Sequence, residues 1–191
     1  MSIETLLCDD VPPTLWKNGK GLVRDLLHWP NEAQWQARIS VADIDVDSPF
    51  SVYEDAERWF SVVQGRGVRL QLPDGWHSVV AEGAAIHFRG EDAPACELID
   101  GPTRDLNLMC RRSAGRGEMA AARPGVPWQS TAALRALFSA DAVTLRDGSD
   151  AEIRLAPFTL AWAEGTRAAW QLDSAMPRPR AWWLAFDPAA R

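Results

Sequence analysis

The chain has 191 residues, of which 47% are hydrophobic, and its formal net charge is −6. That hydrophobic fraction excludes general disorder, and the length suits one domain or two small fused ones with a real core. The negative charge, without a basic cluster anywhere, argues against nucleic acid and against anionic membrane surfaces as partners.

The cysteines and the opening residues indicate a compartment. Cys8, Cys96 and Cys110 have no C-x-x-C spacing and are odd in number, which fits free thiols in a reducing environment. The acidic opening lacks the apolar run of a signal peptide, and no apolar segment of about 18 residues follows it. We therefore expect a cytoplasmic protein that does not span a membrane.

Turn residues and short strands alternate from the start of the chain. Asn18-Gly19 is a strong turn signal because both residues tolerate positive φ. Residues 22–27 follow as a strand, in which Arg24 shares a face with two leucines. A guanidinium in that phase is buried with a partner, directed into a lined pocket, or covers an edge with its aliphatic stem. Residues 35–42 then alternate cleanly between apolar and polar side chains.

A second arginine lies in phase with apolar side chains in residues 58–64. Arg58 falls on the same face of that predicted strand as Phe60 and Val62. Glycine or proline residues separate the short strands that follow, which the sequence predicts at residues 68–72, 76–80, 85–89 and 97–100.

Residues 100–112 begin as a turn and then alternate. Asp105, Asn107 and Met109 fall on one face of the predicted strand, and leucines with Cys110 on the other. A strand that is apolar outside and partly polar inside suits the wall of a small barrel that holds a ligand. The alternative is an ordinary sandwich strand with one wet face.

The second part of the chain gives a smaller set of strands. Residues 111–129 are rich in Gly, Ala and Pro, and we interpret them as the connection between halves. Residues 131–138 contain helix formers but run into a β-prone segment. An Asp147-Gly148 hairpin signal and strands at 153–155, 157–162 and 181–186 complete the pattern. Strands every 8–12 residues predict an antiparallel sandwich or barrel.

Three blocks of sequence carry a family resemblance. The first is Trp16-Lys17-Asn18-Gly19-Lys20-Gly21 with Arg24 and Asp25, the second Trp35 with Arg38-Ile39-Ser40-Val41-Ala42, Pro49-Phe50-Ser51 and Arg58, and the third Asp100-Gly101-Pro102 with Asp105-Leu106-Asn107-Leu108-Met109. Together they resemble the HutD/Ves family over about residues 14–112. Two departures are Lys20, where the family usually has Gly, and residues 52–57, which replace its usual loop before Arg58.

The resemblance implies a fold and a role. The fold is an all-β cupin-type barrel built as two cupin modules in one chain, a bicupin, which we divide into residues 1–115 and 116–191. The implied role is tied to histidine utilisation, as a sensor of the pathway or a brake on it, and no enzymatic activity is attached to the family.

The residues do not suggest a metal or a nucleophile. His28, His77 and His87 form no His-x-His pair, which metal-binding cupins use, so we expect no metal and no cofactor. The chain has no G-x-S-x-G motif and no Cys with plausible His and Asn partners, so we assign no catalytic residue.

Binding chemistry remains. Arg24 and Arg58 offer forks that grip a carboxylate, and asparagine side chains both donate and accept. We predict a small-carboxylate site, for a ligand of the implied pathway such as urocanate, formimino-glutamate or formyl-glutamate. Its predicted residues are Trp16, Asn18, Arg24, Arg58, Phe60, Asp105 and Asn107.

Three functions stay open at this point. The first, which we prefer, is a non-catalytic binder that senses or limits such an acid, and it could form a homodimer. The second is a metal-free cupin enzyme with Asp105 or Glu82 as general base. The third is a protein-interaction module that uses exposed tryptophans such as Trp182 and Trp183.

Overall fold

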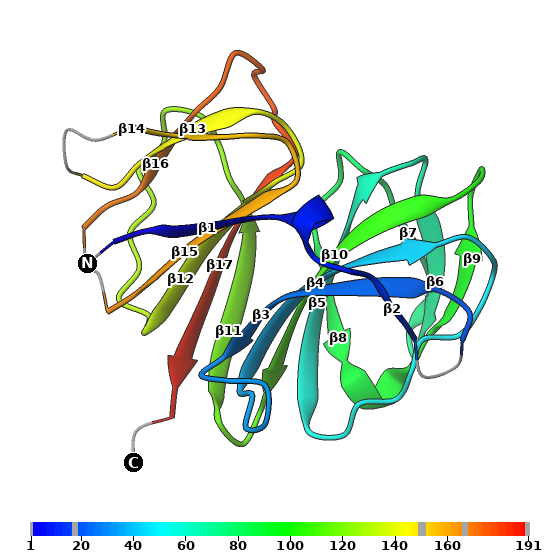
Figure 1. Ribbon diagram of the computed structural model, residues 1–191. Coiled ribbons are helices and arrows are strands. Elements are labelled where there is room, and N and C mark those ends of the chain that lie inside the picture. The colour runs from blue at the N-terminus through cyan, green and yellow to red at the C-terminus, as the bar shows by residue number, and fades with distance from the viewer. Residues whose placement is uncertain (1, 17–18, 149–151, 166–167, 190–191) are drawn as a thin grey trace.

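The computed structural model describes residues 2–16, 19–148, 152–165 and 168–189. The turn predicted at Asn18 therefore lies partly outside the described residues. In the described part of the chain, antiparallel strands form four sheets, and these make two groups that Figure 1 shows side by side. We call the group that contains β2 to β10 the first half, and the group that contains β11 to β17 the second half.

The first half pairs a large sheet with a small one, and two 3-10 turns, η1 (Cys8–Asp10) and η2 (Gly90–Asp92), lie beside its strands. The large sheet has the order β2 (Thr14–Leu15), β3 (Leu22–Trp29), β4 (Ala37–Ile44), β10 (Thr103–Arg111), β5 (Ala56–Gln64) and β8 (Ile86–Arg89). The small sheet has the order β7 (Gly75–Val79), β6 (Val68–Leu72) and β9 (Ala95–Leu98).

The second half repeats this arrangement. Its large sheet has the order β1 (Glu4–Leu7), β15 (Thr159–Glu164), β12 (Leu134–Ser139), β17 (Ala181–Pro188) and β11 (Gly115–Ala121). Its small sheet has the order β14 (Glu152–Leu155), β13 (Val143–Arg146) and β16 (Gln171–Asp173).

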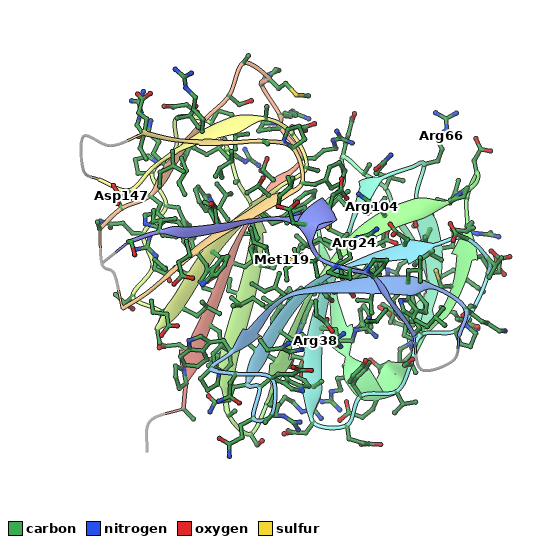
Figure 2. The ribbon with its side chains drawn as sticks, in the orientation of Figure 1. Arg24, Arg38, Arg66, Arg104, Met119 and Asp147 are labelled. Carbon is green, nitrogen blue, oxygen red and sulfur yellow. The ribbon has the colours of Figure 1, made fainter. Side chains whose placement is uncertain are left out.

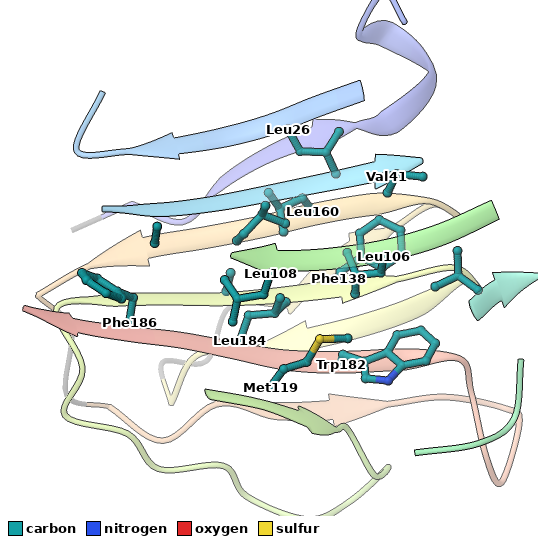
Figure 3. Packing of buried hydrophobic residues seen from close by; sticks show 14 of the residues in the cluster. Leu26, Val41, Leu106, Leu108, Met119, Phe138, Leu160, Trp182, Leu184 and Phe186 are labelled. Carbon is teal, nitrogen blue, oxygen red and sulfur yellow. The ribbon is translucent and has the colours of Figure 1, made fainter. Parts of the chain in front are cut away.

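The two large sheets pack face to face and share the main hydrophobic core (Figure 3). Leu106 and Leu108 of β10 lie against Phe138 of β12 and Leu184 of β17, and all four are at most 1% exposed. The leucine face predicted for residues 100–112 therefore packs between the halves. The opposite face, with Asn107 and Met109, points into the first half.

Each half also has a core of its own between its large and small sheets. In the first half this core includes Phe60, Val62, Leu70 and Phe88. In the second half it includes Leu137, Leu145, Trp170, Leu172 and Trp183. Both faces of each large sheet are therefore buried, one in the shared core and the other inside its own half.

The interpretation of residues 111–129 as a simple connection is wrong. Gly115–Ala121 form β11, which pairs with β17 over seven positions from Gly115↔Pro188 to Ala121↔Trp182. A Cβ on Gly117 would lie 2.5 Å from the Cys110 sulfur, so glycine allows this close approach of β11 to the first half. Gly115 and Gly117, which suggested a linker, are therefore required for close packing.

The ambiguous residues 131–138 contribute to a central strand, and not to a helix. β12 pairs with β15 on one side and β17 on the other, and all six of its residues are buried. Pairing and burial on both faces override the helix propensity of its alanines and leucines. Trp182 and Trp183 on β17 are 2% and 4% exposed, so the expectation that they are exposed for a protein partner is wrong.

The first strand of the chain does not follow the predicted division at residue 115. β1 pairs with β15 from Glu4↔Trp162 to Leu7↔Thr159, so it completes the large sheet of the second half. The chain then crosses through η1 to β2 in the first half. None of the helices in the described ranges is long and apolar enough to cross a membrane.

Candidate functional site

A cavity of about 370 Å³ opens inside the first half, and we call it the pocket. Its walls come from the inner face of the large sheet and from the segment that precedes β5. The side chains used below that line it are Trp16, Asp25, His28, Glu32, Trp35, Arg38, Ser40, Phe50, Tyr53, Arg58, Phe60, Asn107 and Met109.

The strand register sets which of these side chains are neighbours. In one row across the sheet, His28, Arg38, Met109, Arg58 and Phe88 lie opposite one another on successive strands. Directly opposite residues on antiparallel strands bring their Cβ atoms to about 5 Å. The register thus places two arginines on either side of Met109, on one wall of the pocket.

The adjacent row on the same face of the sheet is mixed in character. It contains Asp25, Ser40, Asn107 and Phe60 on β3, β4, β10 and β5. An acid, a hydroxyl and an amide therefore lie next to the arginine row. Hydrogen bonds between the two rows fix the side chains in place.

Arg58 is the predicted residue with the most unusual surroundings. Its side chain is 7% exposed, its Nη2 donates to Asn107 Oδ1 at 2.9 Å, and its Nε and Nη1 have no partner among the described residues. The guanidinium carbon lies 4.8 Å from the centre of the Phe50 ring and 5.3 Å from that of Phe88. Burial lowers the Arg58 pKa to about 10, which still leaves the group charged at neutral pH.

Arg38, in contrast, has a carboxylate partner. Its Nε and Nη2 donate to Asp25 Oδ1 at 2.6 and 2.5 Å, and its Nη1 donates to the Tyr53 hydroxyl at 3.1 Å. The Tyr53 ring lies within 6 Å of the guanidinium carbons of both Arg38 and Arg58. One aromatic ring thus contacts a paired arginine and an unpaired one.

Four predicted site residues meet at the pocket. Arg58, Phe60, Asn107 and Trp16 all line it. The Trp16 indole N–H donates to the Leu22 carbonyl at 3.0 Å, and its ring meets Phe50 edge-on at 6.1 Å. Of the other three predicted residues, Asn18 lies outside the described residues.

Arg24 lies on the other face of β3, away from the pocket. Its Nη1 pairs with Asp43 Oδ2 at 2.5 Å, and Asp43 Oδ1 accepts from Arg104 Nε at 2.8 Å. Figure 2 shows Arg24 beside Arg104 and apart from Arg38. Arg24 does share a face of the strand with leucines, as the sequence indicated. That face, however, turns toward the other large sheet and not toward the pocket. The expectation that Arg24 and Arg58 share one hollow is therefore wrong.

Asp105 shares a face with Asn107 but does not line the pocket. It is fully buried, its Oδ2 accepts from Thr103 Oγ1 at 2.9 Å, and its Oδ1 has no partner among the described residues. Burial raises its pKa well above the ordinary value for an aspartate. Glu82, the other base considered, lines a separate cleft between the halves, together with Arg180 and Trp182.

The three histidines lie in three different places. His28 lines the pocket, whereas His77 contacts Asp74 at 2.8 Å in the β6–β7 hairpin. His87 contacts Glu57 at 2.6 Å and stacks on Trp59. Over the ranges that the structure describes, no three His, Cys, Asp or Glu side chains come together as metal ligands. In the described part of the chain, the three histidines therefore do not converge on one site.

Sequence reasoning missed several residues that shape the pocket. Arg38, Asp25 and Tyr53 were not predicted as site residues, although Arg38 and Asp25 belong to the family-like blocks. Arg38 falls on the face opposite the apolar Ala37 and Ile39, so the argument that selected Arg58, an arginine in phase with apolar residues, passed it over. The Asp25–Arg38 pair joins separate strands, and its contact gives no signal in the linear sequence.

Comparison with known protein families gives one match that spans most of the chain. A family model described as HutD matches residues 9–178. An uncharacterised 21.2 kDa protein from the hutC 3′ region of Pseudomonas putida is 35% identical over 112 residues, covering 56% of this chain and 57% of the relative. Protein Ves of Cronobacter sakazakii is 28% identical over 110 residues, covering 57% and 61%. The alignments thus span less than two thirds of these curated relatives.

Solved structures resemble the chain over nearly its whole length. A conserved protein of unknown function, PA5104 of Pseudomonas aeruginosa PAO1, has a TM-score of 0.87 at 26% identity and covers 98% of this chain and 100% of its own. HutD from Pseudomonas fluorescens SBW25 has a TM-score of 0.85 at 22% identity, with 99% and 100% covered. An oxalate decarboxylase from Lactobacillus farciminis has a TM-score of 0.63 at 8% identity, covering 97% and 86%. The fold is all-β and cupin-like.

Proposed function

The chain belongs to the HutD family, and on this premise we propose that it is a non-catalytic protein that binds a small carboxylate in the pocket. The observation that carries the proposal is Arg58. Its buried guanidinium has an amide as its hydrogen-bond partner, and no carboxylate of the described residues pairs with it. A buried unpaired charge is costly, and a ligand carboxylate would relieve that cost through charge-assisted hydrogen bonds.

The family is associated with histidine utilisation, which directs the choice of ligand. Urocanate and formimino-glutamate are both small acids with nitrogen groups, and both contain the carboxylate that Arg58 would bind. We propose that binding such an acid lets the protein sense or limit its level. The net charge of the chain is −6, so attraction of the acid would come locally from Arg58 and not from the overall field.

The test replaces Arg58 by Met, which keeps a long apolar side chain but removes the charge. Titration calorimetry with urocanate as the probe should show that the variant binds at least about tenfold more weakly than the wild-type protein, because a charged hydrogen bond contributes ~1.5–3 kcal/mol. Arg66→Met is the matched control, since Arg66 is 76% exposed and lies outside the pocket. A wild-type protein that binds no small carboxylate, or an Arg58→Met variant with unchanged affinity, would refute the proposal.

The alternative function is a metal-free enzyme that acts on a similar acid. Neither base considered for it, Asp105 or Glu82, lines the pocket, and this placement favours the binding function. Product analysis after incubating the protein with urocanate and formimino-glutamate separates the two functions, since turnover would support the enzyme.

We extend the proposal to the architecture and the setting. A large and a small sheet enclose a separate core in each half, which supports the description of the halves as two cupin modules. Cys8, Cys96 and Cys110 are free and buried, which is consistent with the cytoplasm. A homodimer remains part of the proposal, and size-exclusion chromatography with light scattering tests it.

A further inference from the structure

The two arginines in the pocket differ in whether a carboxylate pairs with them. Arg38 donates two hydrogen bonds to Asp25, whereas Arg58 donates to a neutral amide. Both line the same cavity, and one row of the sheet contains both. Of the two guanidinium groups in the pocket, only that of Arg58 has no carboxylate partner among the described residues.

We propose that Asp25 is a specificity-determining residue that occupies Arg38 and so sets the pocket for a ligand with one carboxylate, and not two. Asp25 acts as a built-in carboxylate, in the place that the second acid group of a dicarboxylate would need. The inference rests on the proposed function, because it assumes that Arg58 binds the first carboxylate.

The geometry around Asp25 opposes a second negative charge. Arg38 grips Asp25 Oδ1 with two nitrogens, so an incoming carboxylate would have to displace a side chain already held in place. Glu32 also lines the pocket and adds a further negative charge. Like charges brought together without a cation between them repel, and the repulsion grows away from bulk water.

The same geometry favours a hydrogen-bond donor at the far end of the ligand. Asp25 Oδ2 lies 3.9 Å from His28 Nε2, and the Asp25 side chain is 30% exposed, so this oxygen can accept from a ligand N–H. Asn107 and Asp25 lie two strand spacings apart, or about 10 Å at the backbone. One short molecule can therefore reach both ends. The ligand class is a small monocarboxylate whose opposite end carries an N–H group, such as an amide or a nitrogen heterocycle. Of the acids named above, this selects urocanate, which has one carboxylate, over formimino-glutamate, which has two.

The test uses two probes of equal length that differ in one charge. Glutarate has two carboxylates, and glutaramate replaces one of them by an amide. Competition against urocanate, followed by ligand-observed NMR, gives both affinities. In the wild-type protein, we expect glutaramate to bind about tenfold more tightly than glutarate, or better.

Asp25→Asn is the decisive variant because it keeps the shape and one acceptor oxygen of Asp25 but removes its charge. Arg38 then becomes available to a second carboxylate. We expect the preference for glutaramate to fall by about tenfold and even to reverse. Asp45→Asn is the matched control: Asp45 is exposed and does not line the pocket, so the preference should not change.

Arg38→Gln keeps the proposal testable if Asp25→Asn fails to fold. Without Arg38 the Asp25 charge is bare, so discrimination against glutarate should increase. In the Asp25→Asn/Arg38→Gln double variant, the gain in glutarate affinity should disappear. Thermal melting of every variant shows whether it folds.

The outcomes separate this inference from the proposed function. If no carboxylate binds the wild-type protein, both fail. If urocanate binds through Arg58 but glutarate binds as tightly as glutaramate, or if neither the Asp25→Asn nor the Arg38→Gln variant changes their ratio, the proposed function stands. The role of Asp25 is then overturned.

Discussion

Each half of the molecule contains an arginine that packs on aromatic rings, but the surroundings of the two arginines differ. In the first half Arg58 lies on the rings of Phe50 and Phe88 beside the pocket. In the second half Arg135, which is fully buried, lies 4.8 Å from the Trp128 ring centre and 4.7 Å from that of Trp170. An arginine on aromatic rings inside a sheet is therefore not by itself a sign of a binding site.

The difference lies in what surrounds each arginine. Trp128 stacks on Trp183 at 4.9 Å, and the fully buried Trp170 packs at an angle beside both. Arg135 Nη1 donates to the Ala168 carbonyl at 2.7 Å. Indole rings occupy the interior around Arg135, whereas Arg58 lines the open space of the pocket. Open space beside the guanidinium distinguishes the candidate site from a packed core.

The largest expected effect on stability comes from removing a tryptophan ring from the second half. Trp170→Ala should lower the free energy of unfolding by about 3–5 kcal/mol, because it leaves a large cavity among buried side chains. Carboxylate binding in the first half should persist in the folded fraction. Chemical denaturation with calorimetry of the same samples checks both, and loss of binding at full stability would contradict the separation of the halves.

A pair of matched substitutions tests the comparison directly. Arg135→Met should destabilise the protein by about 2 kcal/mol, since it removes a carbonyl hydrogen bond and two cation–π contacts. Arg58→Met should cost less, about 1 kcal/mol or under, because the loss of the Asn107 hydrogen bond and the ring contacts is offset by the removal of a buried charge that no carboxylate pairs with. Urea unfolding of both variants gives the measurement. Equal losses would show that Arg58 is structural as well.

A smaller effect concerns the ion pair that links the halves. Arg180 pairs with Asp141 at 2.5 Å and donates from Nη1 to the Val63 carbonyl of the first half at 3.0 Å. The hydrogen bonds from Arg180 lower the Asp141 pKa below its ordinary value of 3.8.

Because the folded-state pKa is depressed, this stabilisation is present above about pH 4 and is lost as the pH falls through the lower folded value. Asp141→Asn should cost about 1–2 kcal/mol at pH 7, and the gap to the wild-type protein should narrow below pH 4. Thermal melts across that range measure the gap. A gap that stays constant with pH would contradict the assignment to the Asp141 charge.

Much of the first half could be predicted because its strands alternate strongly. The period-2 pattern correctly placed Asn107 opposite Leu106 and Leu108, and it put Arg58 and Phe60 on one face. It failed for Arg24 because both faces of the large sheet are buried, so an apolar neighbour does not tell which face meets the pocket.

Other features depended on contacts between distant segments. β11 escaped prediction because its glycines are selected for close approach and its sequence has no alternating apolar pattern. Asp25 and Arg38 are 13 residues apart and meet across two strands. Propensity and periodicity describe a residue and its near neighbours, and therefore cannot supply such a pairing.

The route of the first strand determines how the molecule can be dissected. A fragment of residues 116–191 would lack β1 and leave β15 with an unpaired edge, while residues 1–115 would carry that strand with no sheet to join. Exposed strand edges recruit other chains, so both fragments would tend to aggregate. Studies of either half in isolation would need a circularly permuted gene that moves the β1 segment to the other end of the reading frame.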